Sequence, residues 1–572
     1  MPAFGPVGVK RRLRFAWLPY LTLAAMLGPV LAGLAGTIAP AFGYLPAAGQ
    51  SDWGLDAFRT LVEWPGFSRA AGVSVSTGFL ATGLSLLIVV LITAGWQGRA
   101  AFVVLQRLLS PLLAVPHAAA AFGLAFLIAP SGWLVRLVSP WATGWEQPPD
   151  VLIVQDAFGL ALVAGLVAKE VPFLLLMTLS ALPQVDGHRS AAVAGALGYG
   201  RVTGWIKAVF PRVYAQIRLP VYVVLAYSMS VVDVAVILGP NTPPTLSVQI
   251  VRWMNDPDIA LRLQAAAAAL VQCALVLGAC GVWRLGESLV ARLGHIWIMR
   301  GGRGMCEGTL QAFGLIAGVA SALAVVLGLA GLAVWSLAGF WSYPDLLPDT
   351  LTWRSWIRHA PGLWDAARET LIVAFVATAV ALVLTLGCLE AEHRFGLRLG
   401  PGGVFLLYVP LLVPQTAFLP GLQTLMLSAG FEVGRGPVIL AHLVFVLPYV
   451  FLSLGDPFRA WDTRFGTIAS ALGAGPDRVL WAVRLPMLLA PLLTAFAVGF
   501  AVSVGQYLPT LLVGGGRVAT LTTEAVSLAA GGDRRAIGVF GLMQTVAAFV
   551  PFLIAVVVPP LVWRHKGGMR NG

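Results

Sequence analysis

The chain has 572 residues, of which 58% are hydrophobic and only 11% are charged, and its mean hydropathy is +0.85. Soluble domains carry about 25% charged residues, so this composition excludes a fold whose whole surface faces water. The net charge of +12 is spread thinly and forms no long basic run, which argues against nucleic acid as a partner. The composition therefore predicts an all-α protein surrounded by membrane lipid.

About twelve apolar segments follow one another, and each is long enough to cross a bilayer as a helix. In the first half they lie near 16–38, 72–95, 104–129, 155–182, 214–239 and 262–284. In the second half they lie near 309–338, 368–389, 403–428, 437–455, 488–512 and 537–562. The first segment is long for a cleaved signal peptide, so we expect it to be a retained span.

Lys and Arg residues concentrate in every second connection between these segments. Counted from a cytoplasmic N-terminus, the inside connections hold 23 of the 37 basic residues. Cytoplasmic loops of membrane proteins carry an excess of this kind. We therefore expect both the N- and the C-terminus on the cytoplasmic side of a multi-pass membrane protein.

The two halves of the chain match each other at a nearly constant offset. Gly198 pairs with Gly473 and Pro211 with Pro486, in both cases 275 residues apart. An offset that holds across helices and loops points to an internal repeat. Six spans separate equivalent points, and an even number returns the chain to the same side, so the halves are expected to be parallel. The predicted six-helix repeats are residues 1–300 and 301–572.

One connection in each half, between its fourth and fifth spans, has the composition of a docking element. The copies read AAVAGALGYGRVTGWIKAVFP, Ala191–Pro211, and TIASALGAGPDRVLWAVRLP, Thr467–Pro486. Each has a helix-forming run of small residues, then Leu-Gly, then a Pro thirteen residues after the Gly. Gly permits the positive-φ turn that ends a helix, and Pro suits the first turn of the next one. Such short helices can sit in a groove on a soluble partner.

This pattern resembles the EAA motif of ABC importer permeases, the loop that docks on the ATP-binding subunit. The resemblance covers both halves, and the chain is similar to fused permeases for ferric iron, thiamine and 2-aminoethylphosphonate, above all to a thiamine-permease-like group. It implies the type I importer fold and the permease subunit of an ATP-driven importer in the bacterial inner (plasma) membrane. It implies as partners two copies of an ABC ATP-binding subunit and a periplasmic or lipid-anchored solute-binding protein.

The resemblance also assigns coupling roles within the two loops. The Glu of the motif is replaced by Ala192 in one copy and Thr467 in the other, so a salt bridge from that position is not available. Docking is then expected to rest on shape and on the flanking basic residues. The implied coupling residues are Ala192, Ala194, Gly198, Trp205, Pro211, Thr467, Ala469, Gly473, Trp481 and Pro486.

Polar side chains inside the spans are candidates for the translocation path. Lys169 and Glu170 lie near the middle of the fourth span, where an unpaired charge costs about 3 kcal/mol or more. A structural ion pair that holds helices together is an equally good interpretation of these two residues. For the others, interhelical hydrogen bonds are the alternative. The path candidates are His117, Lys169, Glu170, Asp233, Gln415 and Gln506.

The sequence holds no recognisable catalytic or metal site. It lacks a G-x-x-x-x-G-K-[ST] loop, so the chain is not expected to be an enzyme, and the partner subunit would bind ATP and Mg. Neither H-E-x-x-H nor G-x-S-x-G occurs, and the four cysteines show no metal-binding spacing. We therefore expect no catalytic residues, metal or cofactor in this chain.

The alternative function is a secondary transporter of the major-facilitator type. Such proteins also have twelve helices in two parallel halves. They usually carry a Gly- and Arg-rich loop between spans two and three, and GWQGRAAF at this place holds little of it. The twin docking loops favour the importer, whereas the solute cannot be read from the sequence.

Overall fold

The computed structural model describes residues 17–46, 49–304, 306–397 and 400–564. Within these ranges the chain is built from α-helices, and the β-structure is limited to two isolated bridges. The prediction of an all-α polytopic membrane protein is confirmed. In these ranges nine helices are long and apolar enough to cross a membrane, or eleven if each of two bent pairs forms one span.

Every predicted span corresponds to one long helix or to a consecutive pair of helices. The first half contains α2 (Leu18–Ala41), α4 (Phe67–Trp96), α5 (Ala100–Leu112) with α6 (His117–Ile128), α8 (Leu160–Ala181), α11 (Phe210–Ser230) with α12 (Asp233–Leu238), and α14 (Leu261–Met299). The second half contains α15 (Glu307–Leu337), α16 (Arg354–Phe395), α17 (Pro401–Leu412) with α18 (Gln415–Ser428), α19 (Arg435–Arg459), α23 (Leu489–Val504) with α24 (Leu508–Gly514), and α26 (Arg534–Val562).

Shorter helices fill the connections. At one end of the molecule lie α9 (Gly187–Ala196), α10 (Arg201–Ala208), α20 (Thr463–Ala471), α21 (Pro476–Val479), the π-helix η3 (Leu480–Arg484) and α22 (Leu485–Met487). The other connections hold α3 (Asp56–Glu63), α7 (Trp133–Val138), η2 (Leu182–Val185), α13 (Leu246–Met254) and α25 (Leu521–Gly531).

Several spans that were expected to be continuous are broken. The third span of each half divides before a Pro, at Pro116 and at Pro414, and α17 and α18 meet at 82°. Proline lacks an N–H group and disfavours helical geometry in the residue before it, which explains both breaks. The predicted span 214–239 is also two helices, and α11 is less apolar than the nine candidate spans because it contains Arg212 and Arg218.

The first helix of each half packs against the other half. Helix α2 lies against α16, α18 and α19, and α15 lies against α4, α6 and α8. Glycine permits these close crossings: a Cβ at Gly33 of α2 would lie 2.2 Å from the carbonyl oxygen of Phe418. Where α6 crosses α15, a Cβ at Gly123 would lie 2.6 Å from the carbonyl carbon of Gly328. Small residues at helix crossings let backbones approach closely in membranes.

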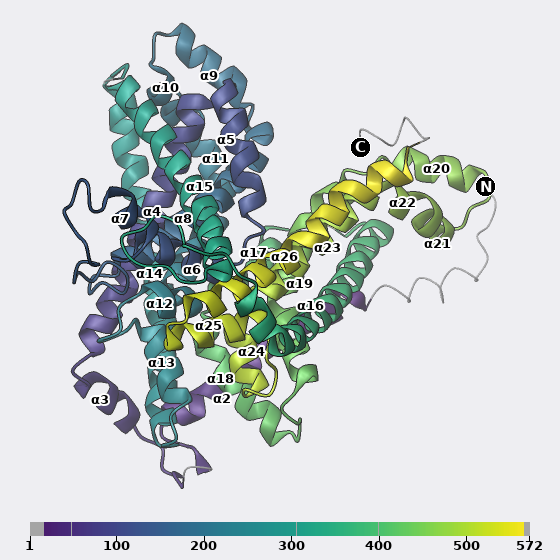
Figure 1. Cartoon of the computed structure of the whole chain (residues 1–572). Coiled ribbons are helices and arrows are strands. Elements are labelled where there is room, and N and C mark those ends of the chain that lie inside the picture. The colour runs from purple at the N-terminus through teal and green to yellow at the C-terminus, as the bar shows by residue number, and fades with distance from the viewer. Residues whose placement is uncertain (1–16, 47–48, 305, 398–399, 565–572) are drawn as a thin grey trace.

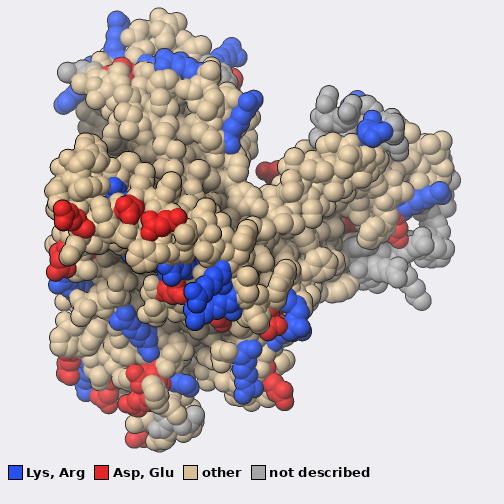
Figure 2. Space-filling model, viewed as in Figure 1, with Lys and Arg blue, Asp and Glu red and all other residues tan. Residues whose placement is uncertain are grey.

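The molecule has two lobes that diverge toward the end carrying the short helices α9, α10 and α20 to α22 (Figure 1). Helices α9 and α10 lie at the end of one lobe, and α20 to α22 lie at the tip of the other. Figure 2 shows an open notch between the lobes, and a broad uncharged band below the charged end of the larger lobe. A shared core from both halves, including Phe122, Leu166, Phe418 and Phe445, joins the lobes.

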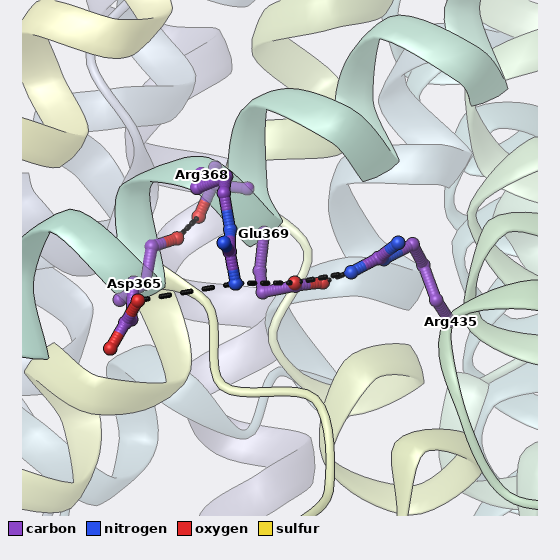
Figure 3. A network of polar contacts seen from close by, with 6 residues as sticks. Asp365, Arg368, Glu369 and Arg435 are labelled. Carbon is purple, nitrogen blue, oxygen red and sulfur yellow. Dashed lines mark hydrogen bonds and ion pairs between the residues drawn. The ribbon is translucent and has the colours of Figure 1, made fainter.

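An ion cluster fixes the start of α19 against α16 (Figure 3). The Arg435 guanidinium donates to both carboxylate oxygens of Glu369, at 2.5 and 2.8 Å. Arg368 adds longer contacts of 3.9 Å to Glu369 and 4.0 Å to Asp365. The Arg435 side chain is 47% exposed, so this pair orients the start of α19 and adds less than about 1 kcal/mol to stability.

Candidate functional site

The first coupling segment, residues 187–211, is a helix, a tight turn and a second helix. Helix α9 ends at Ala196, Gly198 follows with a φ of +81°, and the chain re-enters a helix at Arg201. The backbone N–H of Tyr199 donates to the carbonyl of Ala194 at 3.1 Å, which closes the turn. Glycine is the residue that adopts this left-handed conformation without strain.

The second coupling segment, residues 462–486, repeats this turn. Helix α20 ends at Ala471, Gly473 follows with a φ of +85°, and the N–H of Ala474 donates to the carbonyl of Ala469 at 2.9 Å. Asp462 caps the start of α20 by accepting a hydrogen bond from the backbone N–H of Arg464 at 2.9 Å. The Arg464 side chain also donates to this carboxylate and holds the pKa of Asp462 below its ordinary value.

Each segment exposes two apolar side chains one helical turn apart. Val193 and Leu197 are 56% and 60% exposed, and Ile468 and Leu472 are 59% and 84% exposed. The two pairs stand at the same offset of 275 residues as the glycines. They were not singled out from the sequence, although the i, i+4 spacing combined with the repeat offset would have identified them.

The predicted coupling residues occupy different environments. Ala192, Thr467 and both turn glycines are exposed, whereas Ala194 is buried and Ala469 is half-buried. Pro211 and Pro486 lie in the first turns of α11 and α22. The two tryptophans differ most, since Trp205 is 3% exposed and Trp481 is 70% exposed. The Trp205 ring packs in the core of the first lobe, and its Nε1 donates to the Gln97 side chain at 3.3 Å. Trp205 therefore anchors the first coupling segment to this core.

The start of the second half anchors the first coupling segment. The Glu307 carboxylate, at the beginning of α15, accepts hydrogen bonds from the backbone N–H groups of Val202 and Thr203 at 2.7 and 3.0 Å. It also accepts one from the Thr203 hydroxyl at 2.6 Å. A carboxylate at the N-terminus of α10 satisfies free N–H groups and interacts favourably with the helix dipole. Lys207 adds a bond to the carbonyl of Gly302 at 2.7 Å.

Replacing Glu307 by Ala is expected to destabilise α10 by about 1–2 kcal/mol, because it leaves the cap of this helix empty. The measurement is the melting temperature of the purified protein, together with the rate of proteolysis in the connection between the halves. The control is Glu146→Ala, which removes an exposed carboxylate from a connection elsewhere. Equal melting temperatures and equal proteolysis for the two variants would show that the cap contributes nothing.

A buried ion cluster anchors the second coupling segment. The Arg484 guanidinium, in the π-helix η3, pairs with Glu390 of α16 at 2.7 Å and lies over the Trp461 ring at 4.3 Å. Arg394 pairs with the other oxygen of Glu390 at 2.6 Å and with Asp477 at 2.8 Å. Arg484 and Glu390 are both 3% exposed. The cluster therefore fixes η3 and α21 to the end of α16.

Four of the six path candidates lie at the breaks in the third and fifth spans. His117, Gln415 and Asp233 are the first residues of α6, α18 and α12, and Gln506 lies in the gap between α23 and α24. Helix breaks leave backbone groups without partners inside the helix, so polar side chains are tolerated there. The structure thus places these four candidates at equivalent interruptions of the two halves.

Lys169 stabilises one of these breaks. Its ammonium donates to the carbonyl of Leu112 at 2.8 Å and to that of Val115 at 2.6 Å, and both carbonyls lie where α5 gives way to α6. Within the described residues Lys169 forms no ion pair with Glu170. In the second half, Phe445 occupies the matching position and contacts Phe418 of α18, with ring centroids 5.9 Å apart. Lys169 therefore supplies hydrogen bonds to backbone carbonyls that the break leaves without helical partners.

One path candidate contacts Tyr227 of α11, because the His117 ring lies 4.9 Å from the Tyr227 ring. Tyr227 and Tyr507, which precedes α24, both pack against the core shared by the two halves. No sequence pattern marks these tyrosines, since tyrosine is common in membrane helices for other reasons.

Known proteins resemble this chain over most of its length. It is 32% identical over 504 residues to the inner membrane ABC transporter permease protein YnjC of Escherichia coli (strain K12), which covers 87% of this chain and 89% of that protein. No protein-family model matches the chain.

Two shorter proteins match part of it. The spermidine/putrescine transport system permease protein PotC of Escherichia coli (strain K12) is 23% identical over 224 residues, 39% of this chain and 83% of PotC. The putative 2-aminoethylphosphonate transport system permease protein PhnV of Salmonella typhimurium is 24% identical over 205 residues, 35% of this chain and 77% of PhnV.

Proposed function

Since the chain belongs to the family of ABC transporter permeases, we propose that it is the membrane-spanning subunit of an ATP-driven importer and that its two coupling segments dock on ATP-binding subunits. The observation that carries the proposal is the matched pair of exposed apolar faces, Val193 with Leu197 and Ile468 with Leu472. Each face lies at the end of one lobe, where a soluble partner can cover it (Figure 1).

Two docking faces suit two copies of an ATP-binding subunit, one on each lobe. The ATP-binding subunits would hold ATP and Mg, so this chain needs no cofactor and acts as a transporter, without enzyme activity of its own. When the two subunits close on ATP, they would draw the lobe ends together and narrow the notch of Figure 2. Hydrolysis would release them, and the path would alternate between the two sides of the membrane.

The end that carries the coupling segments faces the cytoplasm in this proposal. Leu18, at the start of α2, packs into the same apolar cluster as Val479 of the second coupling segment, and α26 ends at the tip of this lobe (Figure 1). Both termini would then be cytoplasmic, and a periplasmic or lipid-anchored binding protein would deliver solute to the opposite end. The similarity to YnjC supports a location in the bacterial inner membrane.

The relatives support an importer over a secondary transporter of the major-facilitator type. PotC is named as the permease of a spermidine/putrescine transport system, and PhnV as a putative permease of a 2-aminoethylphosphonate transport system. The repeat offset supports six-helix halves, residues 1–300 and 301–572, although α2 and α15 each pack on the opposite half.

Changing Gly198 and Gly473 together to Val tests the proposal. A side chain at positive φ costs about 1–2 kcal/mol at each turn, so both segments would lose their shape. The experiment purifies the chain with the ATP-binding subunit encoded beside it and measures ATP hydrolysis in lipid. We expect a stable complex whose ATPase activity depends on this chain, and at least about a tenfold loss of that dependence in the double variant.

The matched control is Gly430→Val, which changes a glycine with φ of +80° in a connection outside both coupling segments. An ATPase complex that survives the double variant unchanged would contradict the docking assignment. Absence of any association, combined with uptake driven by a proton or sodium gradient, would move the chain to the class of secondary transporters.

A further inference from the structure

An apolar groove runs between α4 and α14. Its volume is about 410 Å³, and every residue that lines it is apolar. Its α14 side extends from Val271 to Val282, and its α4 side is formed by Val75 and Phe79. At 1.5 Å per residue the groove follows α14 for about 16 Å, close to the depth of one leaflet of the hydrocarbon core, about 15 Å. The groove therefore has the lining and the length to hold one acyl chain.

Aromatic and polar side chains stand at one end of the groove. The Trp283 ring, next to Val282 on α14, stacks on the Phe79 ring with 5.9 Å between the ring centroids. Its Nε1 donates to the hydroxyl of Tyr214 on α11 at 2.8 Å, and this hydroxyl donates to Glu287 at 2.7 Å. Trp and Tyr are enriched where a bilayer meets water, at the level of the lipid headgroups. This end of the groove thus has the composition of a headgroup site.

The charges at this end leave one cation without a partner. Arg284 pairs with Glu287 at 2.7 Å, so their charges compensate each other. Arg218 lies one helical turn from Tyr214 on α11, and in the described ranges it forms no hydrogen bond or ion pair. The residue beside it, Leu219, packs against the same apolar cluster as Trp283 of α14. The headgroup end therefore carries an excess positive charge, which an anion would complement.

The headgroup end points toward the coupling segments. Helix α14 continues beyond Glu287, and the Lys207 ammonium of the first coupling segment donates to the carbonyl of Trp297 at 3.2 Å. In the orientation proposed above, this is the cytoplasmic side. Anionic lipids give the cytoplasmic leaflet a negative surface potential, and basic pockets between helices on this side bind their headgroups.

We propose that α4, α11 and α14 form a binding site for one anionic phospholipid of the cytoplasmic leaflet. One acyl chain lies in the groove, and the phosphate binds Arg218 beside the Trp283 and Tyr214 side chains. The exposed guanidinium of Arg284, whose side chain is 59% exposed, offers the phosphate further N–H donors. This site goes beyond the importer function, and only its leaflet depends on the proposed orientation.

The test titrates the purified, delipidated full-length chain in detergent with lipid and measures bound lipid by native mass spectrometry. The probes are dioleoyl-phosphatidylglycerol and dioleoyl-phosphatidylcholine, which differ in net charge but share their acyl chains. The first bound phosphatidylglycerol is expected to bind at least about fivefold more tightly than the first phosphatidylcholine. Inorganic phosphate at the same concentration should not displace it, because phosphate has no chain to fill the groove.

Two variants separate the groove from the charge. Gly278→Leu fills the groove, and a Cβ at this position meets no described atom within 4 Å, so the fold should be preserved. It should weaken the binding of both lipids about tenfold or more, whereas Arg218→Gln should remove only the preference for phosphatidylglycerol. The controls are Gly28→Leu, at an equally open position of α2, and Arg107→Gln, which removes an exposed arginine of α5. Both should bind lipid like the wild type.

Melting temperatures show whether each variant is folded, and Ala274→Leu fills the same groove if Gly278→Leu is unstable. Equal affinity of the wild type for the two lipids overturns the proposal, as does phosphatidylglycerol binding that the groove variants and Arg218→Gln leave unchanged. A dimer that Gly278→Leu converts to a monomer also overturns it, because a second copy of the chain would then cover the groove.

Discussion

Replacing Leu197 and Leu472 together by Asp is expected to abolish ATP-driven uptake while the protein still folds in the membrane. Both side chains are largely exposed, at 60% and 84%, so their replacement removes few contacts within this chain. In a docked complex each leucine would contribute about 1.5–3 kcal/mol of apolar burial, and a buried carboxylate would add a penalty. The affinity for the ATP-binding subunit should therefore fall at least about a hundredfold.

Co-purification and ATPase activity in lipid measure this effect, and size-exclusion elution with the melting temperature shows that the variant is folded. Leu152→Asp is the matched control, because Leu152 is 77% exposed in the connection between α7 and α8, away from both coupling segments. Single variants should each retain part of the association, since the other lobe can still dock. Full association of the double variant would refute the assigned docking faces.

Replacing Arg484 by Met is expected to destabilise the second lobe by about 3–5 kcal/mol. The substitution leaves the Glu390 carboxylate buried in the cluster with only Arg394 beside it, and it removes the cation that lies over Trp461. Removing one partner of a buried ion pair is strongly destabilising, and here Arg394 would remain as the single arginine between the carboxylates of Glu390 and Asp477. The readout is the melting temperature of the purified chain, together with its association with the ATP-binding subunit.

The matched control is Arg459→Met, which breaks a pair with Glu392 at 3.0 Å whose arginine is 37% exposed. An exposed pair of this kind contributes about 1 kcal/mol or less, so the two variants should differ clearly. The double variant Arg484→Met with Glu390→Gln should recover part of the lost stability, because no charge is then left uncompensated. Equal melting temperatures for Arg484→Met and Arg459→Met would contradict a structural role for the buried cluster.

Much of the fold follows from local sequence. Long apolar segments have to become helices in lipid, since their backbone groups have no other partners there, and each of the predicted segments is a helix or a broken pair of helices. The breaks at Pro116 and Pro414 have a local cause that a sequence reveals. The break before Asp233 has no Pro, and it became evident only from the structure.

The environments of the site residues depend on tertiary contacts. The hydrogen-bond partners of Lys169 could not be read from the sequence, because they are the carbonyls of Leu112 and Val115, more than fifty residues away. Trp205 and Trp481 each follow the turn glycine of their segment, but at the 275-residue offset Trp205 pairs with Leu480, which is also buried, and Trp481 pairs with Ile206. Their different exposure therefore follows from a register difference of one residue.

The reciprocal placement of α2 and α15 also has a consequence for biogenesis. The Thr22 hydroxyl of α2 contacts the carbonyl of Leu384, which follows it by 362 residues. During synthesis α2 therefore enters the bilayer long before its neighbours α16, α18 and α19 exist, and its glycine face has to remain without its final partner until they arrive. Helix α15, by contrast, emerges when α4, α6 and α8 are already in place. The packing of α2 against the second half therefore has to wait until α16, α18 and α19 have been made.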